Sequence, residues 1–345
     1  MQAVRVHPAP PKATPYSPSN PAPSTALHLD SDIPIPKPSQ PEELLVRVKA
    51  TSIVRDMLAW PETFAHEYAI PGNDVSGIVT QVFSPDSKFK PGDEIFGMAD
   101  ADRGATWAEY TIMKESEVTL KPTTLSFVQA AAVPLSAQTA YEALFDHAGL
   151  SRPAVQDVKA RLGARGQEPE QKQQRVLITG AAGAVGAYLV QLAAAVAGVE
   201  VVAATSSNAR NGEFLRTLGA DETVEYGMLE QYQGAFDIII DVVGGEVLEK
   251  CWSYVTDTGV LVSVDSASYN FVSEHEKRGL CKTGVRALFF IVKGSTEGLA
   301  YLAELVDIGA IRSFLVDTYP LAKVREAYDL ANGRYVGRGK FILSV

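Results

Sequence analysis

"VLITGAAGAVGAYLVQLAAAVAGV", residues 176–199, contains no charged side chain. About 20 apolar residues are enough to cross a bilayer, so the stretch allows a membrane span, a buried core helix or a phosphate-binding turn. A membrane span is rich in Leu, Ile and Phe. Here eight residues are alanine, and three of the four glycines lie in the first half. The strand-forming "VLIT" leads directly into those glycines, and this order of strand, Gly-rich turn and helix predicts phosphate binding.

The glycines at 180, 183 and 186 explain how such a turn binds its ligand. They let the backbone approach a pyrophosphate, while the following helix supplies unpaired N–H groups and the positive end of its dipole. The pattern departs from GxGxxG because Ala181 replaces the first glycine. A glycine pattern alone is weak support, and a tight strand–helix turn without a ligand is the alternative.

The rest of the chain predicts an α/β fold with two parts. From Arg175 onward, apolar strands alternate with helical segments, which favours a doubly wound parallel sheet covered on both faces. Before residue 125, short β segments separated by Gly, Pro and Asp turns predict a small barrel-like unit. The closing tail, a β–α–β pattern, is more similar to this early unit and is expected to return to it.

Composition excludes several classes of protein. The 345 residues suggest about two domains. A net charge of -10 argues against nucleic acid and anionic membranes as partners. The only two cysteines, Cys251 and Cys281, exclude a disulfide framework. The start "MQAVRVHPAP" is not a secretory signal, so we expect a cytoplasmic protein.

Two segments interrupt the pattern. Residues 8–41 are rich in Pro and Ser, which forbids helix and predicts a surface loop or a partner-docking arm. Residues 151–174 are polar and rich in charge and Gln, and they predict an exposed insertion or linker.

The end of the second strand of the parallel sheet indicates which nucleotide binds. An NAD site usually has an acid about 20 residues after the glycines. Here the stretch "VVAATSSNARNGEF" has Ser206 and Arg210 but no acid before Glu213. Hydroxyl groups and a guanidinium suit a 2′-phosphate, so we expect NADPH; a solvated Arg210 is the alternative.

Several motifs together resemble the medium-chain dehydrogenase/reductase superfamily, and within it the zinc-independent quinone oxidoreductase and enoyl reductase branch. The resemblance covers nearly the whole chain except the two interrupting segments. The matching motifs are "PGNDVSGIV" (71–79), "KPGDEIFG" (90–97), "WAEY" (107–110), "LSFVQAAAVPLSAQTAYEAL" (125–144), "VLITGAAGAVG" (176–186), "LGADETVEY" (218–226), "FDIIIDVVGG" (236–245) and "VGRGKFILSV" (336–345).

The resemblance implies the domain organisation and a negative prediction about metal. It implies a GroES-like β-barrel catalytic domain from residues 1–125 and 313–345, and a Rossmann NADPH-binding domain from residues 126–312, with a cofactor cleft between them. Zinc-binding members carry Gly-His-Glu where this chain has Gly72-Asn73-Asp74. The scattered histidines and cysteines also lack zinc-site spacing. We therefore expect no metal.

The resemblance also implies site residues. The expected cofactor-binding residues are Thr139, Ala182, Gly183, Ala184, Val185, Gly186, Ser206, Arg210, Tyr226, Val243, Gly244, Phe290, Val292 and Lys340. Among them, Ser206, Arg210 and Tyr226 are expected around the 2′-phosphate.

The catalytic residues are less well defined. The family's "NP.D" run is replaced by residues 52–56, "SIVRD", which removes the asparagine often found near the nicotinamide. Tyr68, Arg55 and Trp60 lie in the segment expected to form the substrate wall. Tyr68 is a candidate proton donor or a packed loop aromatic, and Arg55 is a pocket residue or half of a surface ion pair with Asp56.

Without a Lewis acid, alcohol oxidation loses the group that stabilises an alkoxide, so an electron-poor acceptor is favoured. The leading hypothesis is an NADPH-dependent reductase of a carbonyl-conjugated C=C bond in a small hydrophobic substrate, in secondary metabolism. Quinone reduction, a trans-acting enoyl reductase docked on a polyketide synthase, and NADPH binding without reduction are the alternatives. A homodimer through the apolar "ALFFIV" segment also stays open.

Overall fold

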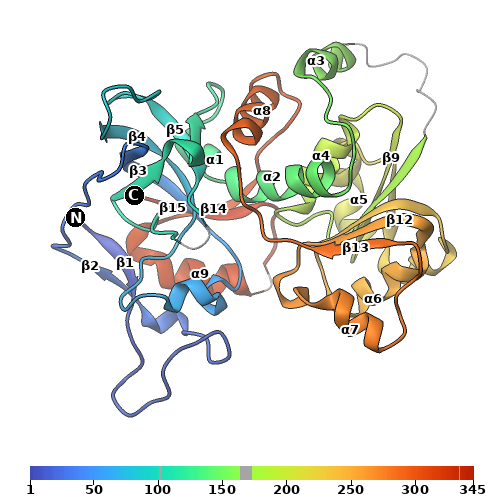
Figure 1. The fold of residues 1–345 in the computed structure, drawn as a ribbon, viewed down its shortest axis with the longest axis horizontal. Coiled ribbons are helices and arrows are strands. Elements are labelled where there is room, and N and C mark those ends of the chain that lie inside the picture. The colour runs from blue at the N-terminus through green and yellow to red at the C-terminus, as the bar shows by residue number, and fades with distance from the viewer. Residues whose placement is uncertain (101–102, 164–172, 334) are drawn as a thin grey trace. The chain divides into compact units, whose positions relative to one another are not determined.

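The computed structural model describes residues 1–100, 103–163, 173–333 and 335–345. The chain forms two units, whose elements are labelled in Figure 1. The first unit consists of Met1–Leu135, Lys293–Asp307 and Ser313–Val345, and the second of Ser136–Val292 and Ile308–Arg312. The mixed α/β fold predicted from the sequence is confirmed.

The second unit is built on a six-stranded parallel sheet in the order β10-β9-β8-β11-β12-β13. Numbered along the chain, this order is 3-2-1-4-5-6, that of a Rossmann domain. Its central strands are buried apolar runs without alternation, as a sheet covered on both faces requires. The strands are β8 (Gln174–Ile178), β9 (Val199–Thr205), β10 (Glu222–Glu225), β11 (Phe236–Asp241), β12 (Val255–Ser263) and β13 (Arg286–Phe289).

The helices of the second unit alternate with these strands. Residues 176–199 are divided between the end of β8, a turn, α4 and the start of β9, and no helix among the described residues is long and apolar enough to cross a membrane. The helices are α2 (Pro134–Tyr141), η5 (Glu142–His147), α3 (Val155–Gly163), α4 (Gly186–Ala194), α5 (Asn208–Thr217), η6 (Tyr226–Gln231), α6 (Gly245–Tyr254), η7 (Ser266–Ser268) and α7 (Phe271–Lys277).

The first unit contains a seven-stranded sheet and a separate β1–β2 hairpin. The sheet runs β14-β15-β3-β4-β5-β7, with β6 also paired to β3, so strands from the last 31 residues join those of the early β region. The return of the tail is therefore confirmed. The strands are β1 (Ala3–Val6), β2 (Leu27–Asp30), β3 (Glu43–Ile53), β4 (Asp74–Val82), β5 (Glu94–Met98), β6 (Tyr110–Lys114), β7 (Val118–Leu120), β14 (Leu315–Pro320) and β15 (Lys340–Ser344).

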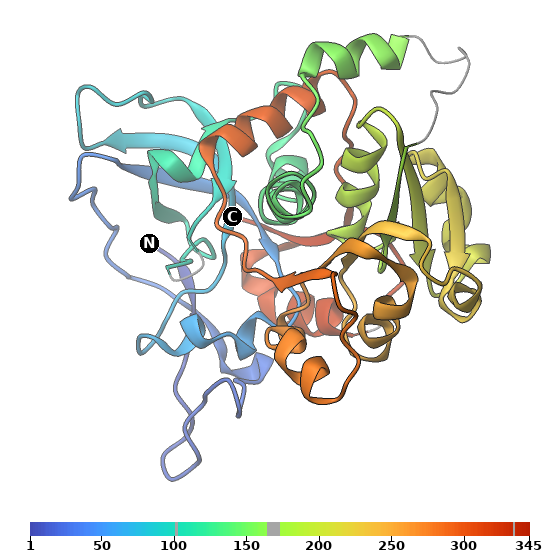
Figure 2. The same cartoon turned by 45° about the vertical axis from the view of Figure 1, so that its right-hand side comes forward.

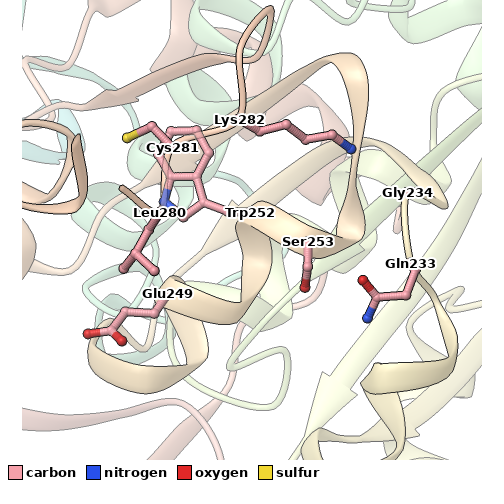
Figure 3. Close-up of a pocket in the computed structure, with 8 residues that line it drawn as sticks. All are labelled: Gln233, Gly234, Glu249, Trp252, Ser253, Leu280, Cys281 and Lys282. Atoms are coloured by element: carbon pink, nitrogen blue, oxygen red, sulfur yellow. The ribbon is translucent and has the colours of Figure 1, made fainter. Parts of the chain in front are cut away.

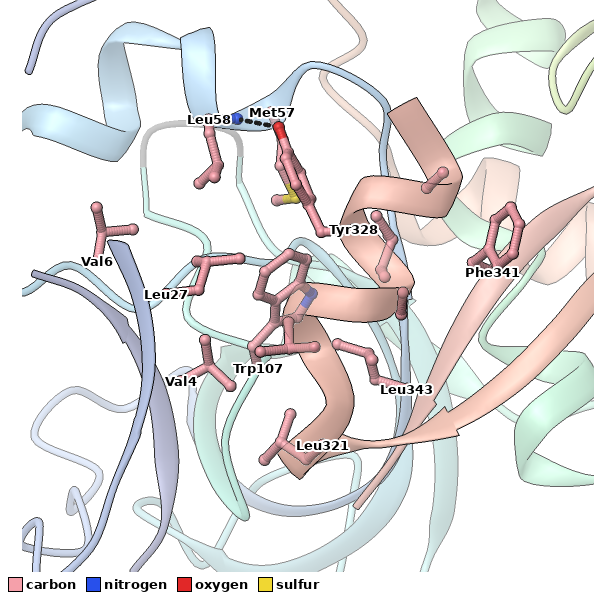
Figure 4. Close-up of a cluster of buried hydrophobic side chains, with 14 of the residues drawn as sticks. Val4, Val6, Leu27, Met57, Leu58, Trp107, Leu321, Tyr328, Phe341 and Leu343 are labelled. Atoms are coloured by element: carbon pink, nitrogen blue, oxygen red, sulfur yellow. Dashed lines mark hydrogen bonds between the residues drawn. The ribbon is translucent and has the colours of Figure 1, made fainter. Parts of the chain in front are cut away.

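The first unit has a core of buried hydrophobic side chains that includes Trp107 and Tyr328 (Figure 4). Trp107 is fully buried, and its indole N–H donates to the carbonyl of Ser52 at 3.0 Å. The Tyr328 hydroxyl accepts from the backbone N–H of Leu58 at 3.1 Å, which joins the early loop to the tail. The helices are η1 (Ser24–Ala26), η2 (Met57–Ala59), η3 (Pro61–Phe64), η4 (Glu115–Glu117), α1 (Phe127–Ala130), α8 (Thr296–Asp307), η8 (Leu321–Lys323) and α9 (Val324–Asn332).

The unit boundaries differ from the predicted domains. Residues 126–135 and 293–307, assigned from the sequence to the 126–312 domain, belong to the first unit. The carboxylate of Asp307, the last residue of α8, accepts from the Thr124 hydroxyl at 3.0 Å and from its backbone N–H at 3.1 Å. The Thr296 hydroxyl donates to the Glu115 carbonyl at 3.2 Å. These bonds hold α8 to the first unit, and its sequence pattern carries no sign of them.

The two interrupting segments are partly structured. The Pro-rich segment forms a long loop that projects from the first unit in both views (Figures 1 and 2). Its middle part packs on the unit, because Ala26 and Leu27 are buried in the core and residues 27–30 form β2. The short helix η1 in the same part corrects the expectation that the prolines forbid helix. In the insertion, residues 155–163 form α3, a mostly exposed helix, which agrees with an exposed insertion and not with a linker, while residues 164–172 lie outside the described residues.

A buried ion pair joins the last strand of the first unit to β4. The ammonium of Lys340, 5% exposed, donates to the carboxylate of Asp74, which is fully buried. Asp74 also accepts from the Ser52 hydroxyl and, at 2.6 Å, from the backbone N–H of Leu135. Every charge in this cluster therefore has a partner, which is the condition under which a buried carboxylate is tolerated.

We predict that Lys340→Met destabilises the protein by about 3–5 kcal/mol in unfolding free energy, because it leaves the Asp74 carboxylate buried without its counter-charge. Lys323→Met is the matched control: the side chain of Lys323 is 59% exposed in its pair with Glu326, so this substitution should cost less than about 1 kcal/mol. Urea denaturation measures both variants. Equal small losses would contradict the prediction.

A second buried polar contact links α6 and α7. The Trp252 indole N–H donates to Nδ1 of His275 at 2.8 Å, and the two residues are 5% and 6% exposed. Burial lowers the pKa of His275 below its usual 6.5, in agreement with a neutral ring that accepts this bond. Below pH 6.5 the unfolded chain therefore binds a proton at His275 more readily than the folded chain does, and the free energy of unfolding decreases as the pH is lowered.

We predict that the melting temperature decreases between pH 7.5 and pH 5.5, and that His275→Leu reduces this decrease. At pH 7.5 the variant should lose about 1–3 kcal/mol, because the Trp252 N–H is left unpaired. Thermal unfolding followed by circular dichroism measures both effects. Exposed His66, changed to leucine, is the control; an undiminished acid effect in His275→Leu would overturn the assignment.

Candidate functional site

Residues 180–186, the glycine turn, connect β8 to α4. A Cβ added to Gly186 would lie 2.2 Å from the Gly180 carbonyl oxygen and 2.6 Å from the Ala181 Cα, so only glycine fits there. Gly183 is exposed, and a Cβ there would meet only the Gly180 carbonyl oxygen, at 3.2 Å. The predicted residues 182–185 are accessible while their neighbours 181 and 186 are buried. The turn is thus packed at its ends and open in its middle, next to the N-terminus of α4.

A buried carboxylate fixes the edge of the sheet from which this turn starts. Asp241, at the end of β11, accepts from the Thr179 hydroxyl at 2.6 Å, from the Ser263 hydroxyl at 3.1 Å and from the Gly244 N–H at 2.9 Å. Burial raises the pKa of Asp241, and these hydrogen bonds oppose the rise. The donors come from the ends of β8 and β12 and from the loop after β11.

This edge is where a ligand is expected in an open parallel sheet. The strand order reverses between β8 and β11, and ligands bind outside the carboxyl ends of strands at such a switch point. Sequence reasoning missed Thr179, Asp241 and Ser263. The one signal was an acid that ended the apolar run "FDIIID".

The residues predicted around a 2′-phosphate lie at the ends of β9 and β10. Ser206 and Arg210 are exposed, after β9 and in the first turn of α5. Tyr226 follows β10, and its hydroxyl oxygen accepts from the Gly180 N–H at 2.9 Å. Desolvation raises the pKa of Tyr226, so the phenol stays neutral. The phenol connects the end of β10 to the first residue of the glycine turn.

The other predicted cofactor residues of the second unit are spread along the sheet edge and its helices. A Cβ on Gly180 would lie 3.1 Å from Val243 Cγ2, so Val243 packs beside the glycine turn. Gly244 has a φ of 71°, and a Cβ there would lie 2.1 Å from an Asp265 carboxylate oxygen. Thr139 is buried in α2. Beyond β13, the ring of Phe290 is 4.1 Å from that of His147, and Val292 is half-buried.

The remaining predicted residues belong to the first unit and have structural contacts there. Lys340 pairs with Asp74, as described. Arg55 donates to the carbonyl of Asn332, the last residue of α9, at 3.4 Å. Its Nε lies 3.6 Å from the Asp56 carboxylate, and both side chains are 66% exposed. Arg55 therefore forms the surface pair that was the alternative interpretation, together with a cap on α9.

Tyr68 and Trp60 have different surroundings. The Tyr68 ring lies 4.5 Å from the Arg5 guanidinium and packs edge-on against His7, so it contacts the β1–β2 hairpin. Tyr68 is 37% exposed, and these contacts favour the packed loop aromatic, while its role as a proton donor stays a prediction. Trp60 is half-buried against the core of Figure 4. Its indole N–H is buried and has no partner among the described residues.

A pocket of about 640 Å³ lies elsewhere in the second unit (Figure 3). Its residues Gly234 and Lys282 precede β11 and β13, so it lies at the amino ends of the strands, away from the glycine turn. The Lys282 ammonium already contacts the Val255 carbonyl and the Asp257 carboxylate, each at 2.8 Å. The pocket is therefore separate from the sheet edge at which a dinucleotide is expected. Its lining consists of Gln233, Gly234, Glu249, Trp252, Ser253, Leu280, Cys281 and Lys282.

The residues at the family's metal position do not fit a zinc ion. Within the described ranges, no group of three or more His, Cys, Asp or Glu side chains is arranged to hold a metal. The Asn73 side-chain N–H donates to the Ala99 carbonyl at 3.4 Å. The Asp74 carboxylate accepts hydrogen bonds from Lys340, Ser52 and Leu135. A lysine ammonium thus supplies the positive charge beside Asp74.

Comparisons with known proteins agree with this architecture. Residues 40–123 match the model of the alcohol dehydrogenase GroES-like domain, and residues 218–343 match that of a zinc-binding dehydrogenase. A solved quinone oxidoreductase from Coxiella burnetii is similar, with a TM-score of 0.81 and 26% identity, over 100% of this chain and 99% of that one.

Two curated relatives are similar over most of their length. A probable zinc-binding mitochondrial oxidoreductase of Arthroderma benhamiae is 36% identical over 94% of each chain. The 2-methylene-furan-3-one reductase of Solanum lycopersicum is 30% identical over 90% of this chain and 74% of that one. The fold, the glycine turn and these relatives together show that the chain belongs to the medium-chain dehydrogenase/reductase superfamily of oxidoreductases.

Proposed function

We propose that the protein is a zinc-independent, NADPH-dependent reductase that transfers hydride to a carbonyl-conjugated C=C bond of a small hydrophobic substrate. One observation carries this proposal: the glycine turn and Tyr226 meet at the carboxyl edge of the Rossmann sheet, beside the exposed Ser206 and Arg210. The turn suits a pyrophosphate and the neighbouring cation a 2′-phosphate.

The residues of the second unit bind and orient the dinucleotide in this proposal. The open middle of the glycine turn and the first N–H groups of α4 receive the pyrophosphate. Tyr226 holds the start of the turn through Gly180, and Arg210 pairs with the 2′-phosphate. A bound nicotinamide supplies the hydride, while the protein contributes orientation and the exclusion of water.

The residues of the first unit support the zinc-independent part. The Asn73 side-chain N–H and the Asp74 carboxylate are bonded within the chain, and the described residues form no group of three or more His, Cys, Asp or Glu side chains that could hold a metal. This favours reduction of an acceptor that is already electron-poor. The Arthroderma relative and one matching family model are named as zinc-binding, so the proposed chemistry of this chain differs from what those names describe.

The substrate class is supported by the relatives. The tomato protein is named a reductase of a methylene-furanone, in which a C=C bond is conjugated to a ketone. A role in secondary metabolism is part of the proposal. Quinone reduction is the second candidate, favoured by the similarity to the Coxiella quinone oxidoreductase.

The binding partners of the protein and its cellular compartment are predictions from the sequence. β13, which pairs only with β12 among the described strands, and exposed Ile291 after it would suit a homodimer. The projecting Pro-rich loop is where a larger synthase would dock. The cytoplasm is the expected compartment, although the Arthroderma relative is named as mitochondrial.

We predict that Arg210→Ala weakens NADPH binding about ten- to a hundredfold, the loss expected for one hydrogen bond to a charged group. NADH binding should change much less, because NADH has no 2′-phosphate. Titration of nucleotide fluorescence with the purified protein measures both dissociation constants. Arg216→Ala, which removes an exposed arginine in the last turn of the same helix, is the control. Loss of both nucleotides in Arg210→Ala alone would argue for misfolding of α5, and no effect would overturn the role of Arg210.

We predict that NADPH oxidation by the purified protein with an exocyclic-methylene ketone proceeds at an unchanged rate after treatment with a zinc chelator. A zinc alcohol dehydrogenase treated in parallel should lose activity. Absorbance of NADPH follows turnover, and mass spectrometry shows whether two hydrogens were added across the C=C bond. Activity that returns only with added zinc would contradict the proposal, and turnover with benzoquinone alone would favour the second candidate.

A further inference from the structure

An acid does lie beside the end of the second strand of the Rossmann sheet, and the neighbouring third strand supplies it. Glu225 is the last residue of β10, and the register pairs it with Thr205, the last residue of β9. Its carboxylate oxygen Oε1 accepts from the backbone N–H of Asn208 at 2.7 Å. Asn208 is the first residue of α5, the helix that carries Arg210.

Glu225 thus accepts a hydrogen bond from the N-terminus of α5, where a 2′-phosphate is expected. The Ser207 side chain makes no capping hydrogen bond, so this carboxylate supplies the acceptor that α5 would otherwise lack. A negative charge at a helix N-terminus is stabilised by the helix dipole. A 2′-phosphate at the same place would use the same positive end and would be repelled by the carboxylate.

Glu225, the last residue of β10, and Tyr226, which follows it, have different effects on cofactor binding. The Tyr226 hydroxyl oxygen accepts from the Gly180 N–H and so holds the start of the glycine turn, which would serve NADH and NADPH alike. Glu225 opposes a 2′-phosphate, and its other carboxylate oxygen is able to accept from a ribose 2′-hydroxyl, as acids do in NAD sites. Arg210 and Glu225 therefore pull the nucleotide preference in opposite directions.

We propose that Glu225 is a specificity-determining residue that weakens the preference for NADPH and makes NADH a usable second cofactor. This inference rests on the proposed dinucleotide function. It depends on the register of β9 and β10, which pairs Glu225 with Thr205 although the two residues are 20 positions apart in the sequence.

The test compares Glu225→Gln with the wild-type protein. Glutamine keeps an oxygen that accepts from Asn208, so α5 retains its cap, while the negative charge is lost. We expect the ratio of NADH to NADPH dissociation constants to rise about tenfold, as removal of a nearby like charge at a partly exposed site should produce. Glu213→Gln is the matched control, because it removes an exposed charge farther along the same helix.

Two smaller probes locate the effect. Adenosine 2′,5′-bisphosphate should gain about tenfold in affinity for Glu225→Gln, whereas AMP should not, because only the former carries a 2′-phosphate. An unchanged ratio in Glu225→Gln, or an equal change in Glu213→Gln, would overturn the inference. If the wild-type protein binds neither NADPH nor NADH, the proposed function fails instead. Circular dichroism of each variant verifies that α5 is intact.

Discussion

The hydrogen bonds to Asp241 are the constraint on which the Rossmann unit depends. Removing a carboxylate from water costs several kcal/mol, and it is tolerated only when donors replace the lost hydration. Here the donors come from Thr179, Ser263 and Gly244, so the ends of three neighbouring strands must stay together for the charge to be satisfied. The glycine turn begins at the residue after Thr179. Its position relative to the sheet edge therefore follows from the same interaction.

The first unit uses the same device with a different partner. Asp74 is also fully buried, but its charge is compensated by Lys340 from the last strand. The Lys340 ammonium stabilises the structure through this pair, but unlike a metal ion it offers no open coordination position to a substrate.

Local patterns made the fold predictable, and long-range pairing limited what could be predicted about the site. The strand–glycine–helix order of residues 176–194 needs no tertiary information, and neither does the break at Pro134, where α2 begins. Glu225 was missed because its neighbourhood depends on strand register. The contacts of Tyr68 with Arg5 and of Arg55 with Asn332 join residues far apart in the chain, so no local pattern signals them. The attachment of α8 to the first unit was missed for the same reason.

The path of the chain between the two units has a practical consequence for protein engineering. The backbone passes from one unit to the other four times, after residues 135, 292, 307 and 312. A single peptide-bond cleavage therefore cannot release either unit as a continuous fragment. Exchange of the nucleotide-binding part with that of a relative would require matched junctions at all four passages, including the five-residue piece Ile308–Arg312. Evolutionary recombination of this fold faces the same topological restriction, which favours gradual substitution within a unit over exchange of whole units.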